Sequence, residues 1–445
     1  MVVKNVSPNS KKLGAFSIWA TGVGIVISGI SFGWNIGWGI TGPFAFFLPV
    51  LIAAIMYYAL VQCLTELACV YPDTTGPHIY VRNAYGKFWG GFIALAILFE
   101  FLFATPAIAS SLGEYIGFLK GDLQLANWFA SFFIGIFCIV NIFDLSIGVK
   151  FIVALTLIAI IELFIYSSSI FLEFKGSNII NSHYDKFDFE SLIKASPFAI
   201  WMFLGIEGVS LMTKNIKEEN FKKTIQSGYN YAIWTLIILA FLVLILASGS
   251  IEWTNSNWAI ISSDNHPMPA SLALILSKES VIVRIFTFIG LFGLAASLQG
   301  VAIASVTQFE YLIGNRIENY SLKRKISSLL VFGLSIFSIW GSHTAFLIEL
   351  SVFGAVLMYF GVSISLLKIR YLKSQNSQKV LEGERTTDNI ISHQDFNPLK
   401  SNIFSIIASI ISLLCISILI YLHPYVFTSF VVIGILYIVF DKFKR

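Results

Sequence analysis

The chain has 445 residues, of which 56% are hydrophobic and only 12% are charged, and its mean hydropathy is +0.79. A soluble domain carries about twice that share of charged residues. So many apolar residues cannot be hidden in a soluble core, and lipid must therefore be part of the solvent. This excludes a soluble enzyme, a nucleic-acid-binding protein and a secreted module. The net charge of +4 gives no further information as a total.

Long apolar runs separated by short polar segments predict membrane-spanning helices, because one span takes about 20 residues. We expect an all-α integral membrane protein with about 12 transmembrane helices. The predicted spans are 14–40, 43–70, 88–118, 126–143, 147–171, 195–213, 227–249, 283–313, 326–341, 344–367, 402–421 and 424–441.

The basic residues predict the orientation, since positive loops stay on the cytoplasmic side. With both termini in the cytoplasm, only six of the 29 basic residues lie outside, namely Lys120, Lys175, Lys186, Lys194, Lys278 and Arg284. We therefore expect a multi-pass protein of the plasma (bacterial inner) membrane with both termini cytoplasmic. The apolar run from Leu13 lacks a small-residue cleavage site, which predicts an uncleaved first span instead of a signal peptide.

Two of the predicted spans are interrupted by glycine. The first span contains Ser28-Gly29-Ile30-Ser31-Phe32-Gly33, and the sixth contains Gly205-Ile206-Glu207-Gly208. A broken helix in a bilayer leaves backbone groups unpaired, which is tolerable only where they line a cavity or hold a ligand. Paired breaks at matching positions predict a transporter built from an inverted repeat, with its binding site at mid-membrane. The alternative is that Gly29, Gly33 and Gly37 only let helices pack closely.

This pattern predicts seven segments in chain order. They are a cytoplasmic N-terminal segment 1–13, a first five-helix repeat 14–171, an external loop 172–194, a second five-helix repeat 195–367, a cytoplasmic loop 368–401, two further helices 402–441 and a cytoplasmic C-terminus 442–445.

Four motifs in order resemble the amino acid–polyamine–organocation superfamily. They lie at 27–35, 71–86, 196–208 and 290–297, with a weaker match at 351–355. The ending Phe32-Gly33-Trp34-Asn35 is most similar to the ethanolamine-permease branch, although that branch carries an acidic residue where this chain has Ile30. The resemblance implies a leucine-transporter-type fold, with discontinuous helices one and six, and uptake or exchange of amino acids or small amines.

The breaks supply the candidate substrate site. Freed N–H groups near Ser28, Gly29 and Ile30, at the positive end of a half-helix, suit a carboxylate, and carbonyls near 201–205 suit an ammonium group. The resemblance aligns Trp201 with an aromatic residue that lies over the substrate, and the alternative is a packing or lipid-facing tryptophan. The substrate-binding candidates are Ser28, Gly29, Ile30, Gly33, Trp201, Phe203, Gly205 and Ile206.

Three carboxylates lie inside apolar spans, where a charge is costly and an ionisable residue is a functional candidate. Glu207 lies in the second break and is the main candidate for coupling substrate occupancy to helix movement. Glu100 resembles a carboxylate of the ethanolamine-permease branch that could contact the amine or carry a proton. Glu162 is a further proton candidate, and the alternative is a neutral acid bonded to a hydroxyl such as that of Tyr166.

The coupling ion has two candidates. Relatives that use sodium place two adjacent hydroxyls on helix eight, whereas Ala295-Ala296-Ser297 offers one. Ser297 is therefore only a weak sodium candidate, and proton coupling or exchange is favoured. The four cysteines Cys63, Cys69, Cys138 and Cys415 lie in or beside apolar runs and are interpreted as small buried hydrophobes. No spacing predicts a metal or cofactor, and no nucleophile motif predicts an enzyme.

The sequence thus predicts a secondary active transporter that moves an amino acid by alternating access. Its expected partners are the small-molecule substrate, membrane lipid and protons as the coupling ion, and no nucleic acid. The alternatives are an ethanolamine or small-amine permease and a non-transporting amino-acid sensor on the same fold.

Overall fold

The computed structural model describes residues 14–72, 76–143, 145–180, 183–215, 220–381 and 401–442. Within these ranges the chain forms helices and no strand. Ten helices are long and apolar enough to cross a membrane, the first running from Ala15 to Thr41. The predicted all-α membrane architecture is confirmed. The predicted segment 1–13 lies outside the described residues, as do residues 382–400 of the predicted loop 368–401 and residues 443–445.

The helices of the first half follow the predicted spans. They are α1 (Ala15–Val26), α2 (Ser28–Ser31), α3 (Trp34–Thr41), α4 (Phe47–Val70), α5 (Pro77–Tyr85), α6 (Lys87–Lys120), the 3₁₀ turn η1 (Leu123–Leu125), α7 (Ala126–Phe143), α8 (Leu145–Ile170), η2 (Phe171–Glu173) and α9 (Gly176–Ile180). In the described residues, α1 to α3 together correspond to the predicted first span.

The second half continues in the same way. It contains α10 (Phe189–Trp201), the 3₁₀ segment η3 (Ile206–Asn215), α11 (Phe221–Ser250), α12 (Asn255–Ser263), α13 (Pro267–Leu276), α14 (Val281–Ile313), η4 (Gly314–Arg316), α15 (Tyr320–Gly341), α16 (Thr344–Leu381), α17 (Ile403–Leu422) and α18 (Pro424–Lys442). The predicted spans 326–341 and 424–441 correspond to α15 and α18, which are not among these ten helices. The part Pro424–Ile435 of α18 is apolar but shorter than the ten.

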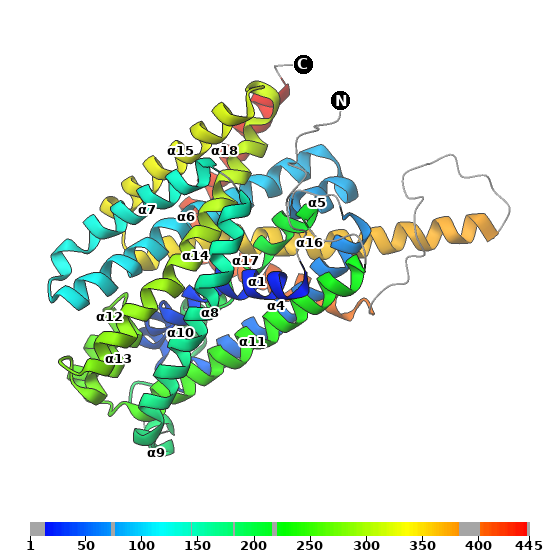
Figure 1. Cartoon of the computed structure of the whole chain (residues 1–445). Coiled ribbons are helices and arrows are strands. Elements are labelled where there is room, and N and C mark those ends of the chain that lie inside the picture. The colour runs from blue at the N-terminus through cyan, green and yellow to red at the C-terminus, as the bar shows by residue number, and fades with distance from the viewer. Residues whose placement is uncertain are drawn as a thin grey trace.

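Four helices extend by six residues or more beyond the predicted limits, namely α10, α11, α15 and α16. The helix α10 begins at Phe189 and not at residue 195, because the Asp188 side chain accepts a hydrogen bond from the backbone N–H of Ser191 and caps the helix. The helix α16 continues to Leu381, so the polar segment that follows residue 367 starts as helix. Figure 1 shows α16 extending past the rest of the bundle.

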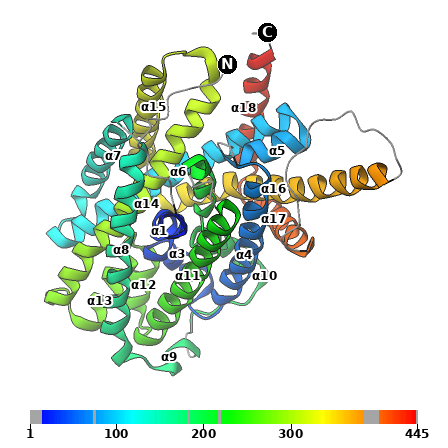
Figure 2. The same cartoon turned by 45° about the vertical axis from the view of Figure 1, so that its right-hand side comes forward.

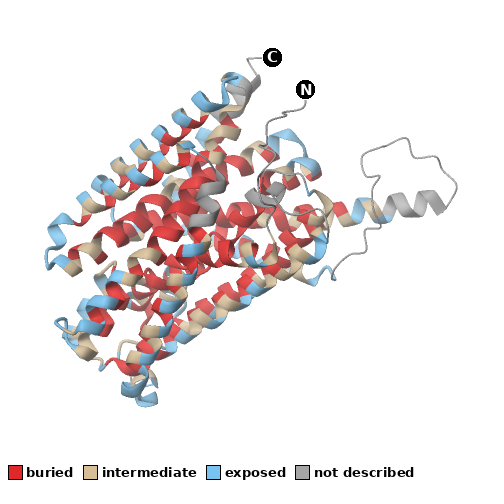
Figure 3. Cartoon of the chain, viewed as in Figure 1, coloured by how far each residue is buried: buried red, intermediate tan, exposed pale blue. Residues whose placement is uncertain are grey.

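The broken first span lies in the middle of the bundle. In Figure 2, α1 is surrounded by α8, α11 and α14, and these helices also contact it. On one flank, α7 and α15 lie side by side (Figure 1). Burial is concentrated in the central helices, whereas the outer helices expose residues on the surface (Figure 3). Large apolar side chains are among these exposed residues, such as Phe132, Phe164, Phe337 and Leu414, as expected of a surface that faces lipid.

A buried ion pair joins α4 to α16. The guanidinium group of Arg370 donates to both carboxylate oxygens of Glu66, and its third contact is Asn402, the residue that precedes α17. The Glu66 side chain is 2% exposed and that of Arg370 is 11% exposed. Such a planar two-point contact fixes the relative position of the two helices more firmly than a single bond would.

An apolar groove of about 520 Å³ lies between α4, α10 and α17. Met56 and Ile200 line its inner part, and Ile52 and Leu414 are exposed on its rim. Ile200 precedes Trp201, the last residue of α10. The groove therefore reaches the outer side of the helix that ends at the second predicted break.

Candidate substrate site

The first span is interrupted inside the predicted segment. A turn at Ile27 separates α1 from α2, and the chain then leaves the helix at Phe32 and Gly33 before α3 begins. Gly33 has a φ of +96°, a backbone conformation that side-chain-bearing residues rarely adopt. The main break therefore lies at the end of the predicted segment and not at its start.

The polar groups around this first break have partners within the protein. The backbone N–H of Ser28 donates to Ser297 Oγ at 3.0 Å, and Ser297 Oγ in turn donates to the carbonyl of Gly24 at 2.8 Å. The Gly33 N–H donates to Oδ1 of Asn35 at 3.1 Å, and the Ile30 N–H donates to the carbonyl of Ile27. The predicted carboxylate pocket at Ser28–Ile30 is therefore closed at Ser28 and Ile30 in this conformation.

The sixth span is interrupted in a similar way. The helix α10 ends at Trp201, residues 202–205 form turns, and η3 begins at Ile206. Gly205 has a φ of +105°, and its N–H donates to Oε1 of Glu207 at 3.0 Å. A carboxylate that accepts from a backbone N–H at a helix break replaces a helical hydrogen bond. Glu207 thus occupies the position that its place in the sequence predicts.

The two breaks are in backbone contact. A Cβ atom on Gly29 would lie 2.4 Å from the carbonyl oxygen of Trp201 and 2.9 Å from Cα of Met202. Only glycine permits so close an approach of one backbone to another. Gly205 instead lies against a side chain, since an added Cβ would lie 2.9 Å from Cγ2 of Ile25. The alternative of simple packing does hold for Gly37, whose added Cβ would meet the ring of Phe46 at 2.2 Å.

Aromatic rings enclose the place where the breaks meet. The buried rings of Trp201 and Phe32 are 5.5 Å apart, edge to face, and those of Phe203 and Tyr57 are 5.6 Å apart. The Trp201 Nε1 has no hydrogen-bonding partner within the described residues. A buried indole N–H without a partner is uncommon. It leaves a donor for a ligand.

Glu207 is the end of a short polar chain. Its Oε2 accepts a hydrogen bond from Oη of Tyr359 at 3.1 Å, and the Tyr359 and Tyr57 hydroxyls are 2.8 Å apart. Tyr57 lies on α4 and Tyr359 on α16, and sequence reasoning predicted neither. No periodicity distinguishes these two tyrosines from other aromatic residues of the apolar spans.

Glu100 on α6 faces Glu207. The two carboxyl groups are near enough to interact, although neither oxygen of Glu100 has a well-formed hydrogen bond to any described residue. Both side chains are at most 1% exposed. Two buried carboxyl groups in contact cannot both be charged unless a cation lies between them. The structure thus brings together two of the three predicted carboxylates.

Glu162 lies elsewhere, on α8, in a recess formed by glycines of α14. Added Cβ atoms on Gly290 and Gly293 would lie 2.6 Å and 3.1 Å from its carboxyl oxygens. The alternative interpretation, in which Glu162 bonds to the hydroxyl of Tyr166, is not supported, because Oη of Tyr166 bonds to Oγ of Ser271 at 2.9 Å. Both Glu162 oxygens lack partners among the described residues.

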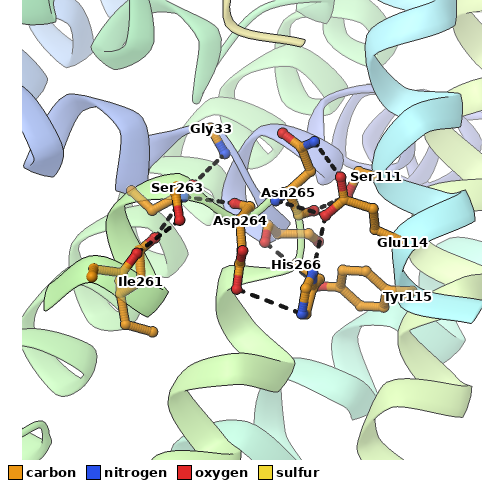
Figure 4. Close-up of polar contacts among 12 residues, drawn as sticks. Gly33, Ser111, Glu114, Tyr115, Ile261, Ser263, Asp264, Asn265 and His266 are labelled. Atoms are coloured by element: carbon orange, nitrogen blue, oxygen red, sulfur yellow. Dashed lines mark hydrogen bonds and ion pairs between the residues drawn. The ribbon is translucent and has the colours of Figure 1, made fainter. Parts of the chain in front are cut away.

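A polar clasp holds the segment Asp264–His266, which links α12 to α13 (Figure 4). Oε2 of Glu114 accepts from the Asn265 N–H at 2.9 Å and lies 3.0 Å from Nδ1 of His266, while Ser111 Oγ donates to the Asn265 carbonyl at 2.6 Å. Burial raises the pKa of Asp264 above its ordinary value, and of two smaller effects His266 lowers that pKa and Glu114 raises it. Glu114, which holds this segment, was not among the candidates selected from the sequence.

The described residues contain no group of three or more His, Cys, Asp or Glu side chains that could hold a metal ion. The hydroxyl of Ser297, the weak sodium candidate, bridges Ser28 and Gly24 as described above. The four cysteines are free, and Cys69 is the one that is not fully buried.

Comparison with known proteins identifies the family. Residues 13–440 match the family described as amino acid permease. The chain belongs to this amino acid permease family. A protein named as an uncharacterised transporter of Rhizobium meliloti strain 1021 is 23% identical over 54% of this chain and 53% of its own length. The amino-acid permease inda1 of Hypocrea atroviridis is 25% identical over 60% of this chain and 46% of its own length.

The matched regions cover about half of the length of these curated relatives. Membership of the permease family, which covers nearly the whole chain, supports a membrane transporter of small molecules. The fold is consistent with this, because the described residues form an all-α bundle with ten helices long and apolar enough to cross a membrane.

Proposed function

We propose that this permease moves an amino acid across the plasma membrane by alternating access. The observation that carries the proposal is the contact between two broken helices, in which Gly29 lies against the backbone of Trp201. Breaks in two different spans bring together, at one place in the apolar bundle, backbone groups that a continuous helix would have paired. The broken helices then tilt around this place and open it first to one side of the membrane and then to the other.

An amino acid fits the chemistry of these breaks. Its carboxylate suits N–H groups of the first break, and its ammonium group suits carbonyls near Trp201–Gly205. In the present conformation Asn35 and Glu207 accept from the Gly33 and Gly205 N–H groups. Substrate binding therefore exchanges an internal hydrogen bond for one to the ligand. Such an exchange links occupancy of the site to the conformation of the break.

The proximity of the Glu100 and Glu207 carboxyl groups supports proton coupling. Because two buried carboxyl groups in contact cannot both be charged alone, the pair holds either a proton or a cation. A substrate ammonium group that enters the site favours the doubly ionised pair and releases the proton. We propose that this exchange couples transport to a proton gradient, with Glu162 as a second proton site.

The same pair supports one alternative substrate class. Ethanolamine or another small amine carries an ammonium group without a carboxylate, and two facing carboxyl groups suit it. A non-transporting sensor on this fold is the less favoured alternative, since it would bind an amino acid without exchanging it across a membrane.

The remaining parts of the proposal concern architecture. We propose twelve spans arranged as two inverted five-helix repeats with α17 and α18 outside them. Both termini lie in the cytoplasm, which places the Asp264–His266 segment outside. The basic residues support this orientation.

Counterflow in proteoliposomes tests the proposal. One labelled amino acid is exchanged against each of twenty unlabelled amino acids, ethanolamine and polyamines. Gly29→Leu and Gly205→Leu should each abolish exchange, whereas Gly333→Leu, at a glycine with nothing within 4 Å of an added Cβ, should not. Normal exchange by the first two variants, correctly folded, would contradict the proposal. Competition by ethanolamine alone would favour the amine permease, and binding without exchange would favour the sensor.

A further inference from the structure

Among the described residues, Asn35 is the one side chain that bonds both to the first break and to the Asp264–His266 segment. It is the second residue of α3 and is fully buried. Its Oδ1 accepts from the Gly33 N–H at 3.1 Å, and its Nδ2 donates to the carbonyls of Ile261 at 2.8 Å and Asp264 at 2.7 Å. The Asn35 amide thus uses both donor hydrogens toward the end of α12 and its acceptor oxygen toward the first break.

Each of these hydrogen bonds pairs a backbone group that has no partner within its own helix. Gly33 lies outside any helix, so its N–H needs an external acceptor. Ile261 and Asp264 lie at the end of α12, where carbonyls have no helical partner. Only a primary amide can serve both sides. An aspartate could still accept from Gly33 but would place a carboxylate against two carbonyl oxygens.

The Asp264–His266 segment has a second attachment, on α6. Glu114 and Ser111 hold Asn265 and His266 from that side (Figure 4). The segment is therefore suspended between α3 and α6, and it can leave its place only if bonds on both sides break. Tyr115, the next residue of α6, reaches the carbonyl of Ser31 with a long 3.5 Å bond, so the same helix also contacts the first break.

We infer that Asn35 is a positioning residue that couples the conformation of the first break to the docking of the Asp264–His266 segment. This rests on the proposed function in one respect: the break is the part of the site that changes when substrate binds. A rearrangement at Gly33 moves the Asn35 amide, and the amide withdraws its two hydrogen bonds from the segment. Conversely, release of the segment frees the acceptor that holds Gly33.

The first experiment measures docking. In a variant with its four cysteines replaced, spin labels at Ala259→Cys on α12 and Gln124→Cys on η1, both at exposed positions, report the distance across the clasp. Asn35→Asp and Glu114→Gln should each lengthen and broaden the distance distribution, with about tenfold more undocked segment. The matched controls Asn127→Asp and Glu318→Gln should leave it unchanged. An unchanged distribution in Asn35→Asp would overturn the inference.

The second experiment measures coupling and does not depend on transport. Hydrogen exchange is followed in the peptide that contains the Gly33 amide. Glu114 has no contact with Gly33. Glu114→Gln should nevertheless speed hydrogen exchange of the Gly33 amide when it is made in the parent chain, but not when it is added to the Asn35→Asp variant. If Glu114→Gln leaves the hydrogen-exchange rate of the Gly33 amide unchanged, the clasp is purely structural and the inference is overturned.

A ligand arm separates this inference from the proposed function. A mixture of the twenty amino acids with ethanolamine should shift the label distance in the parent chain and not in Asn35→Asp. If the mixture has no effect and counterflow is also absent, the proposed function fails. The response of the Gly33 amide to Glu114→Gln then still decides whether the coupling exists.

Discussion

The indole ring of Trp201 fills the space that a side chain on Gly33 would need. A Cβ atom at position 33 would lie 2.5 Å from Cδ1 and 2.8 Å from Nε1 of that ring. The positive φ of Gly33 adds backbone strain to this overlap. We expect Gly33→Ala to displace Trp201 and reduce counterflow by at least about 100-fold, the effect of a small misplacement at a site.

The matched control for this variant is Gly333→Ala, which makes the same change on the lipid-facing side of α15 where nothing lies within 4 Å. Both variants should elute as folded protein in detergent. Full counterflow by Gly33→Ala would mean that Trp201 does not need its present position.

The hydroxyl of Ser297 connects α14 to both sides of the turn at Ile27. Ser297→Ala removes the acceptor of the Ser28 N–H and the donor to the Gly24 carbonyl, and all of these groups are buried. We expect a loss of about 1–3 kcal/mol in the free energy of unfolding, measured as a lower midpoint of thermal unfolding. Ser417→Ala, at an exposed serine of α17 whose hydroxyl bonds to the carbonyl of Leu413, should have little effect.

Glu207 should be needed for proton-driven accumulation. Glu207→Gln keeps one acceptor oxygen but cannot ionise, so the pair with Glu100 loses its exchangeable charge. We expect an imposed pH gradient to drive accumulation in liposomes with the parent chain and not with this variant, while counterflow without a gradient survives at a reduced rate. Tyr359→Phe removes the hydrogen bonds of this hydroxyl to Oε2 and to Tyr57 but leaves both carboxyl groups able to ionise, so it should retain the response. A gradient response that persists in Glu207→Gln would exclude Glu207 as the proton site.

Gly290 provides the space in which Glu162 lies. An alanine there would place Cβ 2.6 Å from Oε1 of Glu162 and 2.8 Å from a ring carbon of Tyr115. We expect Gly290→Ala to destabilise the protein by about 1–3 kcal/mol, the usual effect of overpacking. Glu162→Ala should relieve part of this loss in the double variant. Independent, additive effects of the two substitutions on the thermal midpoint would contradict the contact.

Docking of the Asp264–His266 segment should depend on pH through Asp264. Burial raises the pKa of this carboxyl group in the docked state, with His266 and Glu114 as the charged or titratable neighbours that act on it. Between the ordinary pKa of 3.8 and the raised value, the docked state binds more protons than the undocked state. Docking is therefore stronger below this window and weakens as the pH rises through it.

The spin-label distance across the clasp measures this effect. Asp264→Asn should keep the segment docked as the pH rises and should remove the part of the pH response that Asp264 contributes. A pH response of Asp264→Asn equal to that of the parent chain would exclude Asp264 as its cause.

Much of the fold could be predicted because the bilayer imposes it. A span needs a fixed length of apolar residues, so the predicted span 126–143 coincides with α7 and the other spans differ mainly at their ends. The ends that differ depend on local bonds. The Asp188 cap starts α10 early, and its effect on a helix boundary cannot be read from hydropathy.

The site could be predicted only in part. Glycines with positive φ mark both breaks, and a carboxylate in an apolar run is conspicuous, so Gly33, Gly205 and Glu207 could be selected. The hydrogen-bonded pairings could not be predicted, because the two members of each pair lie far apart in the sequence. Ser297 is 269 residues from Ser28, and Tyr359 is 152 residues from Glu207. Such pairs follow from the packing of helices, which a single sequence does not specify.

The groove between α4, α10 and α17 bears on how binding is measured. Surfactants used for extraction have apolar tails that fit a channel lined by Met56 and Ile200, directly behind the end of α10. A detergent tail bound in this groove would contact α10 and limit the movement of the helix that carries Trp201. Substrate affinities measured in detergent micelles and in lipid vesicles should therefore differ for the same variant. The size of this difference should change with the tail length of the detergent.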